Sequence, residues 1–289
     1  MIKQIKKKWF NLKSTIKYWI EYELVNYSAI VFFLLAAIFF SVLIFYLDFK
    51  DPQFSWHDIL VEAHGLIFDL LIFGLLWTVF EFNKSKKEKI KALTDEINDL
   101  IQLKTEEARV GIISKMNSLY YLGVCKFYIS GAFLKNGSLQ EMDLTESIMV
   151  LINFENGSFI RSTLKNVDLR ASNLKNVYFT DADLENAKLS RSNLSKSKFT
   201  ITNFTNSDLT DCDLDEAEFA GCSYENANFS GVKLTNVLVD NKDWFGELKS
   251  QNVIGIDELE QLYTVSEKPI EKHEGLKFYI IKKRKKIPA

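Results

Sequence analysis

The chain has 289 residues, 47% of them hydrophobic and 26% charged, and its formal net charge is −2. This length predicts one to three domains, and the 3 Pro and 12 Gly leave little room for long loops. The three cysteines, Cys125, Cys212 and Cys222, form no CxxC pair, which excludes a zinc or disulfide framework and fits a reducing compartment.

Residues 1–26 form the first predicted element, a basic amphipathic helix. Its apolar residues recur at three- and four-residue spacing with lysines around the rest of the helix, and they are Ile2, Ile5, Trp9, Leu12, Ile16 and Trp19. This pattern is typical of a helix that lies among lipid headgroups. The alternative is a helix packed on the protein's own hairpin or on another subunit.

Two apolar segments, 27–47 and 59–82, predict a transmembrane hairpin. The first carries no charge over 21 residues, which is long enough to cross a hydrocarbon core of about 30 Å. The connector between them is acidic, whereas lysines flank both outer ends. By the positive-inside rule both termini are then cytoplasmic, which predicts a multi-pass protein of the inner (plasma) membrane with the lipid bilayer as a partner.

The second apolar segment contains three ionisable residues, Glu62, His64 and Asp69. Ionisable groups inside a membrane are costly and are usually paired or functional. Glu62, Gly65 and Asp69 share one helix face, and Gly65 would allow another helix to approach there. Two interpretations stay open: a hydrogen-bonded seam between helices, and an ion path, proton path or lock onto a membrane partner.

Residues 83–130 predict a charged helical stalk. Its apolar stripe consists of Ile90, Leu93, Ile97 and Leu100, at three- and four-residue spacing. The stripe either packs on the first coil of the element that follows or associates with a second copy as a short coiled coil, which would make the protein a homo-oligomer.

Residues 131–240 repeat with a period of five, which neither a helix nor a strand explains. From Leu134 to Val239 a large apolar residue occupies every fifth position in 22 consecutive pentads, and a small residue precedes it by two positions in 20 of them. Asn or Asp lies between the two in 10 pentads, where it favours a turn and tolerates unusual dihedrals. A short fixed period predicts a solenoid whose repeats bury their apolar residues by stacking. The predicted solenoid core includes Leu164, Leu169, Leu174, Phe179, Leu184, Leu189, Leu194, Phe199, Phe204, Leu209, Leu214 and Phe219.

These pentads resemble the A(D/N)LXX motif of the pentapeptide-repeat family, as in ADLEN (Ala182 to Asn186), SNLKN, SDLTD and ANFSG. The resemblance covers residues 134–239 and implies a right-handed quadrilateral β-helix, with one pentad on each side and four in each coil. The expected fold class is therefore α plus β-solenoid, with a two-helix transmembrane hairpin and a helical stalk before the β-helix.

The segment after the repeats predicts a cap and a tail. Residues 241–265 contain more apolar groups than a free tail would carry, which favours two short helices over the last coil. An open β-helix end would otherwise expose unpaired strand edges. Residues 266–289 end in five consecutive basic residues, which are typical of a solvated tail, although they could touch the inner leaflet or nucleic acid.

No phosphate loop, metal-ligand spacing or nucleophile elbow occurs in the sequence, so we expect no enzyme and no cofactor. Two function classes remain. In the first, the chain is a membrane-tethered scaffold that presents its solenoid to an unidentified cytoplasmic protein. In the second, the hairpin oligomerises into a pore or permeabilising element, and the solenoid senses or assembles.

A third function comes from the resemblance, because some pentapeptide-repeat proteins mimic duplex DNA and protect gyrase with a strongly acidic rod. Residues 134–243 here carry 11 basic and 17 acidic residues, a net charge of −6, with the two signs interleaved. Phosphate mimicry needs a more one-sided field. A topoisomerase-binding role and nucleic-acid contacts are therefore the least expected.

Overall fold

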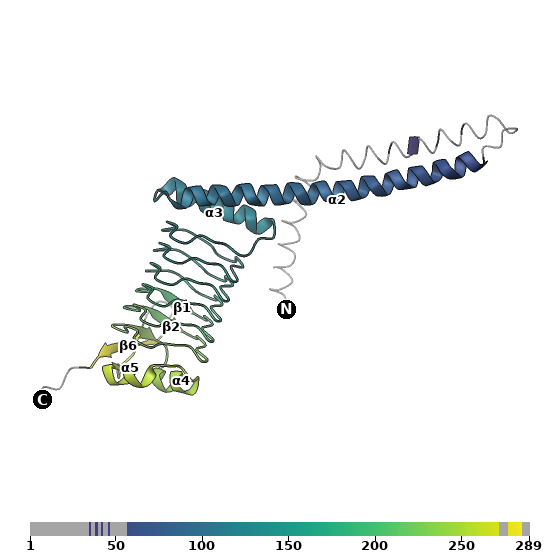
Figure 1. Cartoon of the computed structure of the whole chain (residues 1–289). Coiled ribbons are helices and arrows are strands. Elements are labelled where there is room, and N and C mark those ends of the chain that lie inside the picture. Colours follow the sequence, from purple (N-terminus) through teal and green to yellow (C-terminus); the bar gives the residue numbers. More distant parts are fainter. Residues whose placement is uncertain are drawn as a thin grey trace. The chain divides into compact units, whose positions relative to one another are not determined.

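The computed structural model describes residues 57–271 and 277–284, together with five isolated positions between 35 and 46. The amphipathic helix predicted at 1–26 and the span predicted at 27–47 lie outside the described residues, apart from those five positions. The chain divides into two compact units, Met1–Ala92 and Leu93–Ala289. Figure 1 shows the described elements in chain order.

Helix α2 runs over His57–Ile101 and is 45 residues long. Within the part of the chain that the structure describes, no helix is both long and apolar enough to cross a bilayer. The span predicted at 59–82 lies in α2, where Glu62, Asp69 and Glu81 interrupt the apolar run before the helix continues into a charged half. The predicted membrane anchor is therefore not supported, and the predicted location, a multi-pass protein of the inner membrane, is wrong.

The end of α2 and helix α3 (Glu106–Tyr121) belong to the second unit and pack together. Thr105 caps α3, because its side chain accepts a hydrogen bond from the Ala108 backbone N–H. A Cβ on Gly111 would lie 2.8 Å from Leu100 Cδ1, so glycine permits the close approach of α2 to α3. The Ile97 side chain in the predicted stripe is buried. The described contacts of this part of α2 are with α3, whereas the prediction named the first coil of the solenoid or a second copy.

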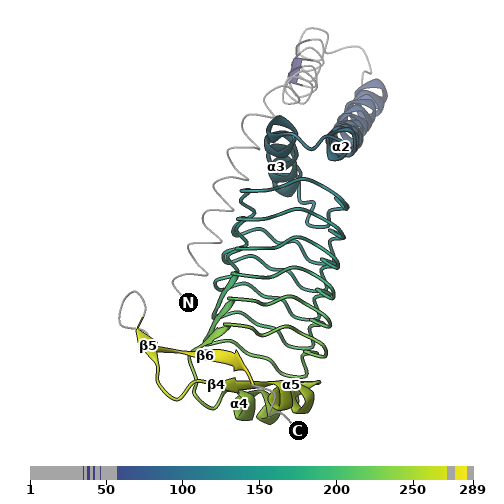
Figure 2. The ribbon, with the colours of Figure 1, turned by 90° about the vertical axis from the view of Figure 1, so that its left-hand side faces the viewer.

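The solenoid follows α3, and four pentads make each of its coils. Parallel β-bridges join each residue to the one 20 positions later, as in Thr163 with Asp183 and Asp183 with Asn203. Three short strands lie on one wall, β1 (Lys198–Thr200), β2 (Glu218–Ala220) and β3 (Leu238–Val239). They pair in parallel with Phe199 opposite Phe219 and Phe219 opposite Val239. Figure 2 shows α3 lying across the first coil and the C-terminal elements across the last.

A left-handed backbone residue in every pentad makes the period five. Every fifth residue from Gly131 to Asn236 has a positive φ, two positions after the inward apolar residue. The Asn and Asp that precede the apolar residue act differently from the prediction: they do not take the positive φ themselves. Their side chains accept hydrogen bonds from the backbone two residues later, as Asn193 Oδ1 does from the Ser195 N–H at 3.0 Å.

The solenoid interior is a set of ladders that run from coil to coil. On the wall that carries β1 to β3, stacked rings of Phe159, Phe179, Phe199 and Phe219 fill the core, with centroids 5.4, 5.0 and 4.8 Å apart. Such offset stacking adds to the free energy gained by burying the rings. Small inward residues bond the backbone instead, and the Ser192 hydroxyl donates to the Leu169 carbonyl at 2.8 Å.

Two helices and three strands cover the last coil. Helices α4 (Trp244–Ser250) and α5 (Ile256–Leu262) follow the solenoid, as predicted for a cap. Trp244 is fully buried, and its ring lies 5.8 Å from that of Phe219. The cap continues beyond the predicted boundary at 265, through strands β4 (Tyr263–Val265), β5 (Ile270–Glu271) and β6 (Lys277–Lys283). Strand β6 pairs antiparallel with β3, so much of the predicted basic tail is ordered structure that covers a strand edge.

Candidate interaction surface on the solenoid

The structure places the predicted site residues in two different environments. All twelve predicted core residues are buried inside the solenoid. Glu62, His64 and Asp69 lie on α2 in the other unit, where the Asp69 side chain is exposed. The side chains of Glu62 and His64 fall outside the described part. These three residues therefore form no described site, and outward residues of the solenoid provide the candidate surface.

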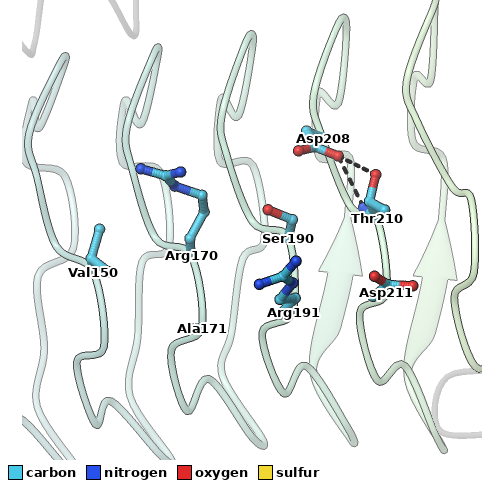
Figure 3. A pocket seen from close by; sticks show the side chains of 8 residues that line it. All are labelled: Val150, Arg170, Ala171, Ser190, Arg191, Asp208, Thr210 and Asp211. Carbon is cyan, nitrogen blue, oxygen red and sulfur yellow. Dashed lines mark hydrogen bonds between the residues drawn. The ribbon is translucent and has the colours of Figure 1, made fainter.

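One solenoid wall carries an open hollow, which Figure 3 shows. This wall comes from the pentads centred on Met149, Leu169, Leu189, Leu209 and Phe229, and we call it the arginine face. The hollow has a volume of about 480 Å³ and is lined by Val150, Arg170, Ala171, Ser190, Arg191, Asp208, Thr210 and Asp211. Both arginines and both aspartates of this set project from neighbouring coils into one surface.

Two aspartates of the arginine face are fixed by local bonds. Asp208 Oδ1 accepts from the Thr210 N–H at 3.0 Å and from the Thr210 hydroxyl at 2.5 Å. Asp168 accepts two hydrogen bonds from the Arg170 guanidinium, at 2.8 and 2.6 Å. The hydrogen bonds from Arg170 hold the pKa of the Asp168 carboxyl below its ordinary value. The Arg170 side chain is therefore held in place by its own pentad and shapes the hollow as a fixed group.

Arg191 and Asp211, by contrast, have no ion-pair partner among the residues that the structure describes. They lie on successive coils of one corner and share it with Leu151 and Ala171. We call these four residues, each 20 positions from the next, the corner ladder. A Cβ on Gly231 would lie 2.4 Å from Asp211 Oδ1, so that glycine leaves space for the Asp211 carboxylate to lean away from Arg191. Both charges thus stay available to a ligand.

Exposed apolar residues lie on the coils before the two charges. Leu151 is 63% exposed, and Tyr128 and Ile148 on the same wall are also exposed. Leu151 holds a positive φ of 60°, a conformation that Gly, Asn and Asp adopt with the least cost. A bulky residue in this region costs about 1–3 kcal/mol, and such strain clusters at functional sites. The apolar end of the corner ladder is therefore both exposed and strained.

The two solenoid thiols, Cys212 and Cys222, are buried in the core. Burial raises the pKa of Cys212 to about 12 and that of Cys222 to about 11, so both are protonated at neutral pH. Their sulfurs contact the carbonyls of Leu189 and Phe199, in the same way as the inward serines. Among the described residues no cluster of His, Cys, Asp and Glu has the arrangement of a metal site.

The corner ladder is not apparent from the sequence alone. Its members are 20 residues apart, so they become neighbours only when the sequence is written in rows of one coil. The observable signal was an apolar residue at a position that is usually Asn, Asp or Gly, as at Leu151 and Ile201. The first pentad was also missed, because the large Phe127 fills a position that elsewhere is small, although Ile129 after it is buried like the other inward residues.

Comparisons with known proteins agree with the repeat. The family model described as "Pentapeptide repeat region" matches residues 172–243. No curated protein matches the sequence. One similar solved structure is Rfr23, a pentapeptide repeat protein from the cyanobacterium Cyanothece 51142. It is 19% identical, with 48% of this chain and 97% of Rfr23 covered and a TM-score of 0.38.

Two further solved structures match with lower TM-scores. HetL, from Nostoc sp. strain PCC 7120, is 24% identical with a TM-score of 0.25. The match covers 38% of this chain and 53% of HetL, about half its length. QnrB1, a plasmid-mediated fluoroquinolone resistance protein, is 13% identical, with 43% of this chain and 89% of QnrB1 covered and a TM-score of 0.18. The repeat sequence, the 20-residue coils and the family match agree, and the chain therefore carries a pentapeptide-repeat β-solenoid.

Proposed function

We propose that the solenoid is a protein-binding module and that its arginine face docks a protein partner. The observation that carries this proposal is the corner ladder. Leu151 is exposed at a costly positive φ, and Arg191 and Asp211 on the same corner lack ion-pair partners among the described residues. Ile201 on the opposite corner is equally strained and exposed, so it is the two opposite charges without ion-pair partners that distinguish the Leu151 corner.

The remaining charges of the solenoid support a protein partner over a phosphate backbone. Most of its lysines and the other two arginines contact a carboxylate in the same coil or the next, as Lys165 does with Glu185 at 2.5 Å and Lys196 with Glu216 at 3.4 Å. Paired charges present neither a continuous basic stripe nor a continuous acidic one. A local patch that combines an apolar residue, an arginine and an acid is typical of the centre and rim of a protein interface.

Site-specific photo-crosslinking tests the proposal. A photoreactive amino acid is placed at Ala171 in the full chain, inside the corner ladder, in cells that express the protein. The matched control position is Asp181, which is also exposed and also has a positive φ, but lies on the opposite corner. We expect a discrete protein adduct from position 171 alone. Adducts of equal yield from both positions, or from 181 only, would contradict the assignment of the arginine face.

A further inference from the structure

We infer that the partner element that binds the arginine face is an α-helix lying along the solenoid axis. This inference rests on the proposed function and names the partner's chemistry: an apolar residue at i, an acidic residue at i+7 and a basic residue at i+11. These three would face Leu151, Arg191 and Asp211.

The spacing of the corner ladder favours a helix. Successive coils are separated by about 4.8 Å, and a helix advances about 5.4 Å with each turn. Leu151 and Arg191 are two coils apart, roughly 9.6 Å, whereas i and i+7 are about 10.5 Å apart on a helix. Positions i, i+7 and i+11 also lie within a narrow angular range, because 3.6 residues make one turn. One helix face can therefore contact the ladder over three coil intervals.

Ala171 makes the close approach of a helix possible. It lies between Leu151 and Arg191 on the ladder, is exposed, and presents only a methyl group. A partner residue at i+4 would lie opposite it, where a side chain of almost any size has room. Figure 3 shows the labelled Ala171 and Arg191 on neighbouring coils.

The order of the acidic and basic residues in the partner helix sets the direction in which the helix lies along the corner ladder. An acid at i+7 and a base at i+11 form an i, i+4 pair with the acid nearer the N-terminus, which is the order that stabilises an isolated helix. The reverse direction would put the base first and give the less stable order. The N-terminus of the partner helix therefore lies at the Leu151 end of the ladder.

Helical peptides of equal composition test the inference by fluorescence anisotropy with the full chain. The matched peptide carries Leu, Glu and Lys at i, i+7 and i+11 of an alanine-rich helix, and the swapped peptide exchanges Glu and Lys. We expect the matched peptide to bind about tenfold more tightly, since like charges oppose each other in the swapped one. The R191E/D211R double variant should reverse this preference, and both of its positions are exposed.

Several outcomes would overturn the inference. If a matched peptide with a central proline binds equally well, the partner element is an extended segment and not a helix. If the chain self-associates and the L151N variant does not, the arginine face binds a second copy of the chain. No saturable binding of any peptide, while position 171 still crosslinks to a protein, would reject the helix and leave the proposed function standing. Loss of crosslinking as well would reject both.

Discussion

A residue with positive φ occurs once in every pentad. Some side chains at this position favour folding, whereas others are strained and exposed. Asn fills this position repeatedly, and ladders such as Asn136, Asn156 and Asn176 also bond to each other, with N–O distances of 3.0 and 2.9 Å. Leu151 and Ile201 hold the same backbone with bulky side chains, φ 60° and 55°, while both remain more than 60% exposed. Their side chains therefore gain little from burial to offset the backbone cost.

Leu151→Asn is expected to stabilise the solenoid by about 1 kcal/mol, because Asn tolerates the left-handed conformation and the lost side chain is exposed. The same variant should lose the partner that crosslinks at position 171. Ile201→Asn, on the opposite corner, is the matched control and should give a similar gain in stability with unchanged crosslinking. Denaturant unfolding measures the first effect. A destabilised L151N variant would show that the side chain serves folding.

The inward position of a pentad is far less tolerant than its outward neighbour. Leu184 is fully buried, and a carboxylate there would have neither water nor a partner. We expect Leu184→Asp to unfold the solenoid, whereas Glu185→Lys leaves it folded. Glu185 contacts Lys165, and a surface ion pair contributes about 0–1 kcal/mol. Thermal melting followed by circular dichroism distinguishes them, and equal melting temperatures would contradict the inward register.

The two buried thiols make stability fall at alkaline pH. Burial raises the pKa of Cys212 from 9.0 to about 12, so above pH 9 the unfolded chain loses a proton that the folded chain keeps. Stability attributable to this thiol is therefore complete below pH 9 and declines as the pH rises toward 12. Cys222 behaves alike up to about pH 11. In the Cys212→Ser/Cys222→Ser variant the free energy of unfolding should fall less steeply with pH. The difference is up to about 1.4 kcal/mol per pH unit for each thiol removed. Parallel pH profiles of the two proteins would contradict this.

At the level of elements, the parts predicted well were those set by local periodicity. The five-residue period and the inward residues follow from the sequence because each pentad satisfies the same steric rule. The extent of the caps does not follow, because it depends on pairing between distant segments. Strand β6 contains Lys282 and Lys283, the first two of the five basic residues that suggested a tail, and its Leu238–Ile280 pairing with β3 orders it. The apolar residues of α2 predicted a membrane span, but the helix lacks a sufficiently long and apolar stretch.

The C-terminal cap depends on Trp244. Its ring contacts Phe219, Tyr224 and Phe229, and its Nε1–H donates to the Tyr224 hydroxyl at 3.3 Å. Trp244→Ala should destabilise the chain by about 3–5 kcal/mol, since it leaves a cavity over the last coil. Glu258→Ala, at an exposed position of α5, is the control and should be nearly neutral. A loss below about 1 kcal/mol on urea unfolding would show that the last coil is stable without this ring.

At the level of the whole molecule, the coil period of 20 residues organises both the charges and the core. Lys126–Glu146, Lys135–Glu155 and Lys233–Asp213 each join residues 20 apart, at 2.9, 3.0 and 3.6 Å. This pairing places basic side chains beside acidic ones on successive coils, which opposes the one-sided field that phosphate mimicry needs. Because each coil contacts only its neighbours, fold and binding should be separable by removing a coil.

Deletion of residues 172–191 removes one coil and joins Ala171 to Ser192, which keeps the inward register and brings Phe199 onto Phe159. We expect this variant to fold with a lower free energy of unfolding, because one coil interface is lost. Deletion of 172–189 removes almost the same length but shifts the register by two residues, so the large apolar residues move to the outward positive-φ position and the solenoid should not form. Circular dichroism and proteolysis compare the folding of the two variants.

The 20-residue deletion also removes Arg191, so it should fold without crosslinking from position 171. If the 18-residue deletion folds, the coil period does not govern folding. If the 20-residue deletion still crosslinks from position 171, the corner ladder does not govern binding.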